Sequence, residues 1–302
     1  MITTLYYYIK GSITVILIIL NTLFGSFFLI PASFLKLVLR IKPAQTILSH
    51  IVLGIAYTWM RINLLILNMM HTTEWIVEGN FHPDKNTSYL LISNHQSWTD
   101  IIVLMKIFLG KIPFLKFFLK KELFWIPILG VAWWALDYPF MKRYPKSLIE
   151  KKPHLKGKDI EITRKACEKF KGKPVTIMNF VEGTRVTPEK QKRQDSPFTH
   201  LLRPKAGGVG FVFTIMGEQI SSILNATIAY PGGPYTFWEY LCGRIPEIIV
   251  HVEEIPMTEK LLGDYMNDPV FRDYFQKWIN GLWIEKDEKL DSMLKAVKNT
   301  TN

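Results

Sequence analysis

The sequence predicts an α/β protein with a largely parallel central sheet flanked by helices, preceded by an N-terminal two-helix membrane hairpin. Up to Met70 the chain is dominated by two long apolar stretches, and after Met70 short β-rich runs alternate with helical ones. Such alternation is typical of a parallel sheet whose strands are connected by helices. We therefore expect membrane-attachment helices over residues 1–72, and an α/β domain with C-terminal helices over residues 73–302.

The first apolar stretch covers residues 11–39 and is interrupted only by weakly polar residues, Pro31 and Lys36. It exceeds the roughly 20 residues that a helix needs to cross a bilayer. It is also too long for the apolar region of a cleaved signal peptide. We therefore predict a membrane helix here.

The second apolar stretch, residues 44–70, carries polar side chains that are costly in lipid unless they face protein or the headgroups. These are His50, Arg61, Asn63 and Asn68. Basic residues and Pro43 separate the two stretches, which predicts a helical hairpin. The hairpin either crosses the bilayer or dips into one leaflet, and the positive-inside rule does not decide, because Lys10 flanks its other end.

Beyond residue 72, short runs of β-branched, aromatic and aliphatic residues predict strands. The predicted strands are residues 74–77, 89–93, 138–141, 174–180, 224–230 and 247–252. Helices are predicted over residues 99–108, 111–120, 160–171 and 208–220. From Thr258 onward we expect two or three polar helices, whose apolar face is formed by Phe271, Phe275, Trp278 and Trp283.

The chain is both basic and apolar, with a net charge of +11, 48% hydrophobic residues, a pI of about 9.4 and a mean hydropathy of +0.11. This combination favours a membrane-surface protein over a nucleic-acid binder. Residues 142–173 are dense in lysine, and we expect an exposed insertion there. Its lysines form either an ordinary solvated face or a surface that attracts anionic lipid or an acidic cosubstrate. The two cysteines lack metal-ligand spacing, so we expect neither a disulfide framework nor a bound metal.

Residues 94–100, Asn-His-Gln-Ser-Trp-Thr-Asp, lie where a predicted strand turns into a predicted helix. Ser97 is a suitable N-cap, which places Asp100 in the first turn, where the helix dipole favours a carboxylate. Asp100 can then accept a hydrogen bond from one nitrogen of His95 and leave the other nitrogen free to take a proton. We predict His95 as a general base with Asp100 as its partner. The alternative is that both are ordinary structural residues at a strand end and a helix start.

The second motif is Glu182-Gly183-Thr184-Arg185, which also follows a predicted strand. Ligands of open α/β sheets bind at the carboxyl ends of the strands, and His95 lies at the same predicted edge. Gly183 allows the backbone to approach a ligand, while Thr184 and Arg185 offer donors that match phosphate. Glu182 would repel a phosphate, so we assign it to holding Arg185 or the loop backbone. The alternative is an exposed turn with an ordinary arginine.

Two further segments carry cations, namely Lys120-Lys121 and Arg143. Taken alone, each is more typical of a helix end or a strand end than of a ligand site. The sequence contains no Gly-x-Ser-x-Gly elbow, no His-Glu-x-x-His pair and no phosphate loop ending in Gly-Lys-Ser/Thr. We therefore expect direct attack by an activated hydroxyl rather than a covalent enzyme intermediate.

In their order and spacing these four segments resemble the acyltransferase family that includes glycerol-3-phosphate and 1-acylglycerol-3-phosphate O-acyltransferases. The resemblance spans roughly residues 75–230. It implies that His95 is the catalytic base and Asp100 its partner. It also implies that the acceptor's phosphate is held by Arg143, Gly183, Thr184 and Arg185. Together with Lys120, Lys121 and Glu182, these are the predicted substrate-binding residues.

Trp98 and residues 225–230 look more like the branch of lysocardiolipin acyltransferase-like enzymes and their bacterial relatives. The chain departs from the family pattern at two places. Val181 stands where a proline often precedes Glu-Gly-Thr-Arg, and the usual proline of the fourth block is missing near Ile228.

We therefore expect a membrane-bound acyltransferase that moves a fatty acyl group from acyl-CoA or acyl carrier protein to the free hydroxyl of a lysophospholipid. The expected acceptor is 1-acylglycerol-3-phosphate, which would give phosphatidic acid; lysophosphatidylglycerol and lysocardiolipin are the alternatives. No cofactor is expected beyond the acyl thioester cosubstrate, and the expected location is the bacterial inner membrane, with the catalytic domain on the cytoplasmic side. Two rival functions remain, a lipid thioesterase or phospholipase that uses the same base on water, and a non-catalytic membrane adaptor.

Overall fold

The computed structural model describes residues 2–141 and 158–300. It divides into two compact units, each assembled from separate segments of the chain. The first unit contains Met1–Gly11, His71–Leu115 and Gly172–Asn302, and the second contains Ser12–Met70 and Lys116–Lys171. The first unit therefore holds the central sheet, and the second holds most of the two long apolar helices.

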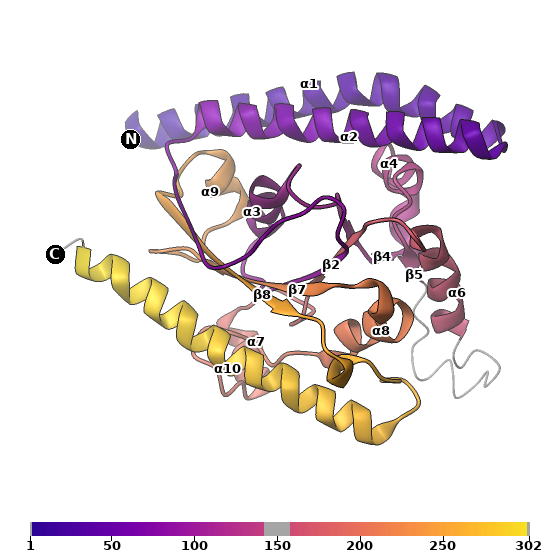
Figure 1. The fold of residues 1–302 in the computed structure, drawn as a ribbon. Coiled ribbons are helices and arrows are strands. Elements are labelled where there is room, and N and C mark those ends of the chain that lie inside the picture. Colours follow the sequence, from indigo (N-terminus) through magenta and orange to yellow (C-terminus); the bar gives the residue numbers. More distant parts are fainter. Residues whose placement is uncertain (1, 142–157, 301–302) are drawn as a thin grey trace. The chain divides into compact units, whose positions relative to one another are not determined.

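A mixed, mostly parallel sheet forms the centre of the first unit (Figure 1). In spatial order its strands are β1 (Glu74–Glu78), β8 (Glu247–Pro256), β7 (Ser222–Ala229), β2 (Tyr89–Ser93), β6 (Thr176–Phe180) and β3 (Leu115–Phe117). β2 runs parallel to β6 and β7, and β1 runs parallel to β8, whereas β7 and β8 are antiparallel. The predicted fold class is thus confirmed.

The two central strands are covered on both faces. Every residue of β2 and β7 is buried, which agrees with their nearly continuous apolar sequences. The helix α3 (Thr99–Phe108) lies on one side of the sheet, and α8 (Ala206–Met216) and α10 (Pro269–Thr300) lie on the other (Figure 1). α10 is held by Phe275, Ile279 and Trp283, which are fully buried. The short helices α7 (Pro188–Gln194) and α9 (Phe237–Leu241) complete the main helices of this unit.

The second unit contains most of α1 (Ile2–Val38) and all of α2 (Lys42–Met70), both long and apolar enough to span a membrane. A buried cluster of Leu29, Ala32 and Val52 joins them to Ala135. The remaining elements are β4 (Leu119–Lys120), a 3-10 helix (Lys121–Trp125), α4 (Leu129–Ala135), β5 (Phe140–Met141), α6 (Lys158–Cys167) and a second 3-10 turn (Glu168–Phe170).

Three polar residues of the apolar stretches are buried and bond to protein, whereas His50, Arg61 and Asn68 of the second stretch are exposed. The Asn21 side-chain amide donates to the Asn63 side-chain oxygen at 2.8 Å and to the Trp59 carbonyl at 3.0 Å, so α1 and α2 are joined by hydrogen bonds. Lys36 is buried and donates to the Ala135 carbonyl at 2.7 Å and to Asp137 at 2.9 Å. These bonds remove the desolvation cost that an unpaired polar group would impose in an apolar setting.

Three elements differ from those predicted. Residues 111–120 are not helical and form β3 and β4, because Pro113 lacks a backbone donor and the aromatic run that follows favours an extended chain. The strand predicted at 138–141 shortens to Phe140–Met141. The C-terminal region forms one 3-10 turn at Glu259–Leu261 and a single long α10, because Gly281 does not break the helix. Residues 142–157 of the predicted lysine-rich insertion lie outside the described residues.

Replacement of the glycine that follows β1 tests the packing of the sheet. Gly79 has a φ of +110°, and a Cβ added there would lie 1.9 Å from the Val252 carbonyl oxygen of β8. We expect Gly79→Ala to lower the free energy of unfolding by at least about 1–3 kcal/mol, measured by thermal unfolding in detergent. Gly281→Ala is the matched control, because nothing lies within 4 Å of its added Cβ and alanine stabilises a helix by up to about 1 kcal/mol. Equal melting of Gly79→Ala and the native protein would contradict this packing.

Candidate active site

The predicted histidine lies in the loop between β2 and α3, and the residue before it fixes this loop to β7. Asn94 is fully buried; its side-chain oxygen accepts from the Ile228 N–H and its amide donates to the Ile228 carbonyl, both at 2.9 Å. The Gln96 side chain donates to the same carbonyl at 2.9 Å. The backbone around His95 is therefore anchored to the neighbouring strand from both sides.

The carboxylate of Asp100 organises the loop and orients the histidine. Its Oδ2 atom lies 2.8 Å from His95 Nδ1 and accepts the backbone N–H groups of Gln96 at 2.7 Å and Ser97 at 2.9 Å. Its Oδ1 atom accepts the Tyr230 hydroxyl at 2.6 Å. An ionised carboxylate only accepts hydrogen bonds, and this one has the four donors just named as its partners. We assign the Nδ1 proton to this bond, which leaves Nε2 as the free acceptor of His95.

The helix start differs in detail from the prediction. α3 begins at Thr99, as predicted, but its N-cap position is Trp98, whose side chain makes no capping bond. The Ser97 hydroxyl accepts from the Thr99 N–H at 3.2 Å. The N-cap position is thus one residue later than predicted, although the Ser97 hydroxyl still accepts an N–H of the first turn.

The imidazole of His95 is held but remains accessible. Its side chain is 12% exposed, and one face stacks on Phe180 at the end of β6, with 3.8 Å between ring centroids. No hydrogen-bond partner for Nε2 occurs within the described part of the chain. The ring is thus fixed in orientation, with one nitrogen able to exchange a proton with a ligand.

Tyr230 was missed by the sequence analysis, although it closes a predicted strand. It follows β7, which is parallel to β2, so both chains emerge at the same edge of the sheet. Burial and the neighbouring Asp100 raise the pKa of the Tyr230 hydroxyl well above its usual value. The hydroxyl therefore remains a hydrogen-bond donor to Asp100.

The carboxylate of Glu182 joins the two motif loops. One oxygen accepts the His95 N–H at 3.2 Å, and the other accepts the Leu202 N–H at 3.1 Å. Of the two roles considered from the sequence, Glu182 therefore takes the one of holding loop backbone. Burial raises the pKa of Glu182 above its usual range, an effect that these two hydrogen bonds and Lys286 oppose. The Val186 N–H also donates to the His95 carbonyl at 2.8 Å.

Cations surround the loop that contains Gly183, which adopts a φ of +70°. The guanidinium of Arg185 lies 5.1 Å from the ring centroid of Trp98, an exposed residue close to His95 in the sequence. Lys190 donates to the Thr184 hydroxyl and to the Arg185 carbonyl, both at 2.8 Å. These contacts bring the two motifs together and leave the Arg185 side chain exposed for an anion.

Lys205 is a further cation that the sequence analysis missed. Its ammonium lies 3.5 Å from the position that a Cβ would occupy on Gly183. Its side chain forms no ion pair within the described part of the chain. Lys205 directly precedes α8, whose first turn contains glycines. A cation at such a helix start is a sequence feature that could have identified it.

The remaining predicted substrate residues belong to other parts of the chain. Lys120 and Lys121 are exposed residues of the second unit, and Arg143 lies outside the described residues. Among the residues that the structure describes, no group of three or more histidine, cysteine, aspartate or glutamate side chains is arranged to hold a metal ion.

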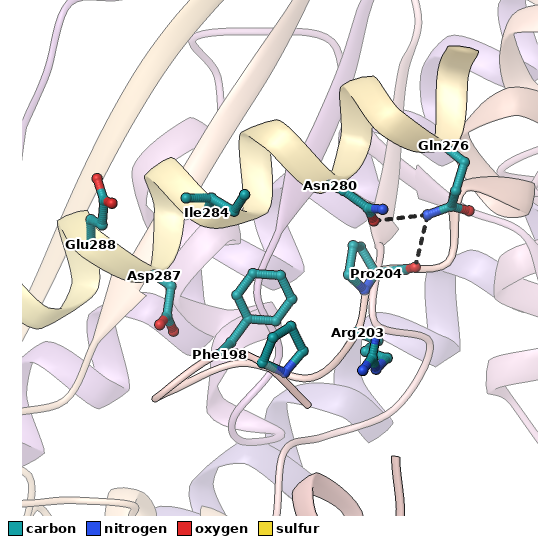
Figure 2. Close-up of a pocket in the computed structure, with 9 residues that line it drawn as sticks. Phe198, Arg203, Pro204, Gln276, Asn280, Ile284, Asp287 and Glu288 are labelled. Carbon is teal, nitrogen blue, oxygen red and sulfur yellow. Dashed lines mark hydrogen bonds between the residues drawn. The ribbon is translucent and has the colours of Figure 1, made fainter. Parts of the chain in front are cut away.

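A separate groove lies between α10 and the chain that precedes α8 (Figure 2). It has a volume of about 590 Å³. Its lining residues are Pro197, Phe198, Arg203, Pro204, Gln276, Asn280, Ile284, Asp287 and Glu288. None of them belongs to the His95 and Asp100 site, so we do not assign the chemistry to this groove.

Comparison with known proteins gives consistent similarities. Residues 74–218 match the family described as Acyltransferase. The chain is 24% identical to lysocardiolipin acyltransferase 1 of Mus musculus over 96% of its own length and 75% of that protein. It is 25% identical to 1-acyl-sn-glycerol-3-phosphate acyltransferase 3 of Arabidopsis thaliana over 76% of its length and 62% of that protein.

Two further similarities involve a yeast protein and a solved structure. The chain is 24% identical to 2-acyl-1-lysophosphatidylinositol acyltransferase of Saccharomyces cerevisiae over 66% of its length and 60% of that protein. The crystal structure of the 1-acyl-sn-glycerophosphate acyltransferase of Thermotoga maritima aligns over 94% of both chains, with 20% identity and a TM-score of 0.49. The chain thus spans less than two thirds of the plant and yeast relatives.

The Tyr230 hydroxyl gives a direct test of the buried network. Tyr230→Phe removes the donor to Asp100 Oδ1 and leaves part of a fully buried carboxylate unsatisfied. We expect the free energy of unfolding to fall by about 1–3 kcal/mol, measured by thermal or denaturant unfolding. Tyr235→Phe, which loses a 3.1 Å bond to the Pro231 carbonyl near the surface, should cost about 1 kcal/mol or less. Equal effects of the two changes would show that Asp100 does not depend on Tyr230.

Proposed function

Because this chain belongs to the acyltransferase family, we propose that it transfers a fatty acyl group from a thioester to 1-acylglycerol-3-phosphate, with His95 as the general base. The observation that carries this proposal is the 2.8 Å contact between His95 Nδ1 and Asp100, with Nε2 left free beside a cationic loop. The broader assignment, a lysophospholipid acyltransferase, agrees with the relatives named above.

The geometry supports a direct transfer. His95 Nε2 removes the proton from the acceptor hydroxyl while the hydroxyl oxygen attacks the thioester carbonyl. The resulting tetrahedral intermediate collapses, the carbon–sulfur bond breaks, and the departing thiolate takes up the proton from the imidazolium. A thioester is already activated, so base catalysis worth about 10²- to 10⁴-fold, together with positioning, suffices without a covalent enzyme intermediate. Asp100 stabilises the imidazolium that forms.

The acceptor is assigned from the cations near His95. Arg185 is exposed and can bind a phosphate through two parallel hydrogen bonds, and Lys205 supplies a second charge beside Gly183. A terminal phosphate monoester carries more charge than the phosphodiester of other lysophospholipids and suits this pair of cations. Gly183, Thr184, Arg143 and the Lys120-Lys121 pair remain predicted substrate residues, and acyl-CoA or acyl carrier protein remains the predicted donor.

The two apolar helices support the proposed membrane location. α1 and α2 have the length and composition of membrane helices, and the proposed substrates are membrane lipids. We place residues 1–72 as the attachment and residues 73–302 as the catalytic part. The proposed location is the bacterial inner membrane, with the active site facing the cytoplasm, where acyl thioesters are made.

Replacement of the base is the first test. We expect His95→Ala to reduce acyl transfer by at least about 10²-fold without altering folding or membrane association. The assay follows thiol release from acyl-CoA with and without lysophospholipid. His200→Ala is the matched control, because His200 also contacts an aspartate at 3.3 Å, but that aspartate is Asp291 of α10. Thiol release that is independent of the acceptor would indicate a hydrolase, and its absence under all conditions would indicate a non-catalytic protein.

Replacement of Arg185 tests the assignment of the acceptor. Removing charge-assisted hydrogen bonds worth about 1.5–3 kcal/mol should raise the KM for 1-acylglycerol-3-phosphate by roughly 10- to 100-fold in Arg185→Ala. The exposed Arg193 of α7 offers the control Arg193→Ala. A panel of lysophospholipids, with products resolved by mass, identifies the preferred headgroup. An unchanged KM in Arg185→Ala would move the phosphate site elsewhere, and a preference for a diester headgroup would replace the proposed acceptor.

A further inference from the structure

A tryptophan between the two catalytic residues occupies a position where neither packing nor helix capping requires it. Trp98 is the N-cap residue of α3, a position that favours serine, threonine, aspartate or asparagine. Its side chain makes no capping bond, and the residue is 55% exposed. The turn is held instead by the Ser97 hydroxyl and by Asp100, whose carboxylate accepts the N–H groups of Gln96 and Ser97. The fold of this turn therefore does not depend on the indole.

The indole of Trp98 contacts the guanidinium of Arg185. The Arg185 Cζ atom lies 5.1 Å from the ring centroid, within the range of a cation–π interaction. Among the described residues, the Arg185 side chain has neither a hydrogen bond nor an ion pair. Lys190 and Lys205, which also lie at this loop, are cations and cannot attract a guanidinium. The aromatic ring is therefore the group that holds the charged end of Arg185.

A cation–π contact differs from an ion pair in the donors that it leaves free. A guanidinium carries five N–H donors in a planar fork, and a carboxylate partner would occupy two of them in a bidentate pair. An aromatic face attracts the positive charge without accepting from this fork. Arg185 is thus held in place with its donors available to an anion.

The place of Trp98 in the chain connects Arg185 to the base. Trp98 directly follows the two residues whose N–H groups are bonded to the same Asp100 oxygen that contacts His95 Nδ1. The imidazole and the indole therefore belong to one short turn that one carboxylate fixes. In 1-acylglycerol-3-phosphate, the free hydroxyl is on the carbon next to the one that carries the phosphate. The base and the phosphate-binding group must then keep a short and constant separation.

We propose that Trp98 is a positioning residue, which holds the guanidinium of Arg185 ready to bind the acceptor's phosphate beside His95. This inference rests on the proposed function and adds a residue to its acceptor site. Without the ring, Arg185 keeps its charge but loses its fixed orientation. The acceptor then binds more weakly, while the chemical step at His95 is unchanged.

The first experiment measures acyl transfer in variants that weaken the aromatic face. We expect Trp98→Leu, which keeps an apolar side chain but has no π face, to raise the KM for 1-acylglycerol-3-phosphate about two- to fivefold with an unchanged kcat. Trp98→Phe keeps a weaker π face and should give a smaller rise. Tyr274→Leu is the matched control and should leave KM unchanged, because Tyr274 is an exposed aromatic residue of α10 that contacts Phe271 instead.

A double variant shows whether the effect of Trp98 passes through Arg185. In the Arg185→Ala background the ring has no guanidinium to hold, so adding Trp98→Leu should produce no further rise in KM. A native KM in Trp98→Leu would overturn the proposal. The same relative rise in KM with and without Arg185 would also overturn it, because the indole would then act by another route.

A measurement that needs no turnover separates this role from the proposed function. In protein with isotope-labelled arginine, the side-chain NMR signal of Arg185 is identified by its absence from Arg185→Ala. The ring current of the indole should displace this signal from that of Arg193, an exposed arginine of α7. Trp98→Leu should abolish the displacement. Glycerol 3-phosphate should bind with a Kd about two- to fivefold higher in Trp98→Leu than in the native protein.

The outcomes of this measurement do not depend on acyl transfer. An undisplaced Arg185 signal in the native protein, or an equal Kd in the two proteins, would overturn the role of Trp98. A displaced signal and a weakened Kd in a protein that transfers no acyl group would count against the proposed function alone.

Discussion

The structure of the site depends on one buried carboxylate. Asp100 has no exposure to solvent and collects donors from the loop after β2, from the imidazole of His95 and from Tyr230 beyond β7. A buried charge without such partners would cost several kcal/mol. The same bonds that stabilise the charge also set the orientation of the histidine ring. Stability and chemistry therefore rest on the same contacts.

A second buried carboxylate extends this arrangement to the anion-binding loop. Glu182 bonds the backbone of His95 and of Leu202, and Val186 bonds His95 from the other direction. These contacts place the loop with Arg185 next to the imidazole without any direct bond between the two side chains. In the proposed reaction, they would keep the phosphate of the acceptor and its hydroxyl at a fixed separation, which is the positioning that direct transfer requires.

The buried polar groups of the apolar helices follow the same physical rule as the site, since they bond to protein. Asn21, Asn63 and Lys36 all have partners in the second unit. Leucine, isoleucine and phenylalanine side chains along α1 remain exposed, as expected of surfaces that contact lipid. The apolar pattern alone left open whether the polar residues of the second stretch face protein. Asn63 does, because its side-chain oxygen accepts a hydrogen bond from Asn21.

The fold class, the bounds of β2 and α3, and the pairing of His95 with Asp100 could all be predicted from the chain, because apolar runs, helix periodicity and a short spacing are local properties. Local patterns failed at residues 111–120, where Pro113 overrode an apparent helix. Tyr230 and Lys205 became visible only in three dimensions, since both lie far from His95 along the chain. Their roles come from parallel strands and a packed helix that bring distant residues to one place, and no local pattern encodes that proximity.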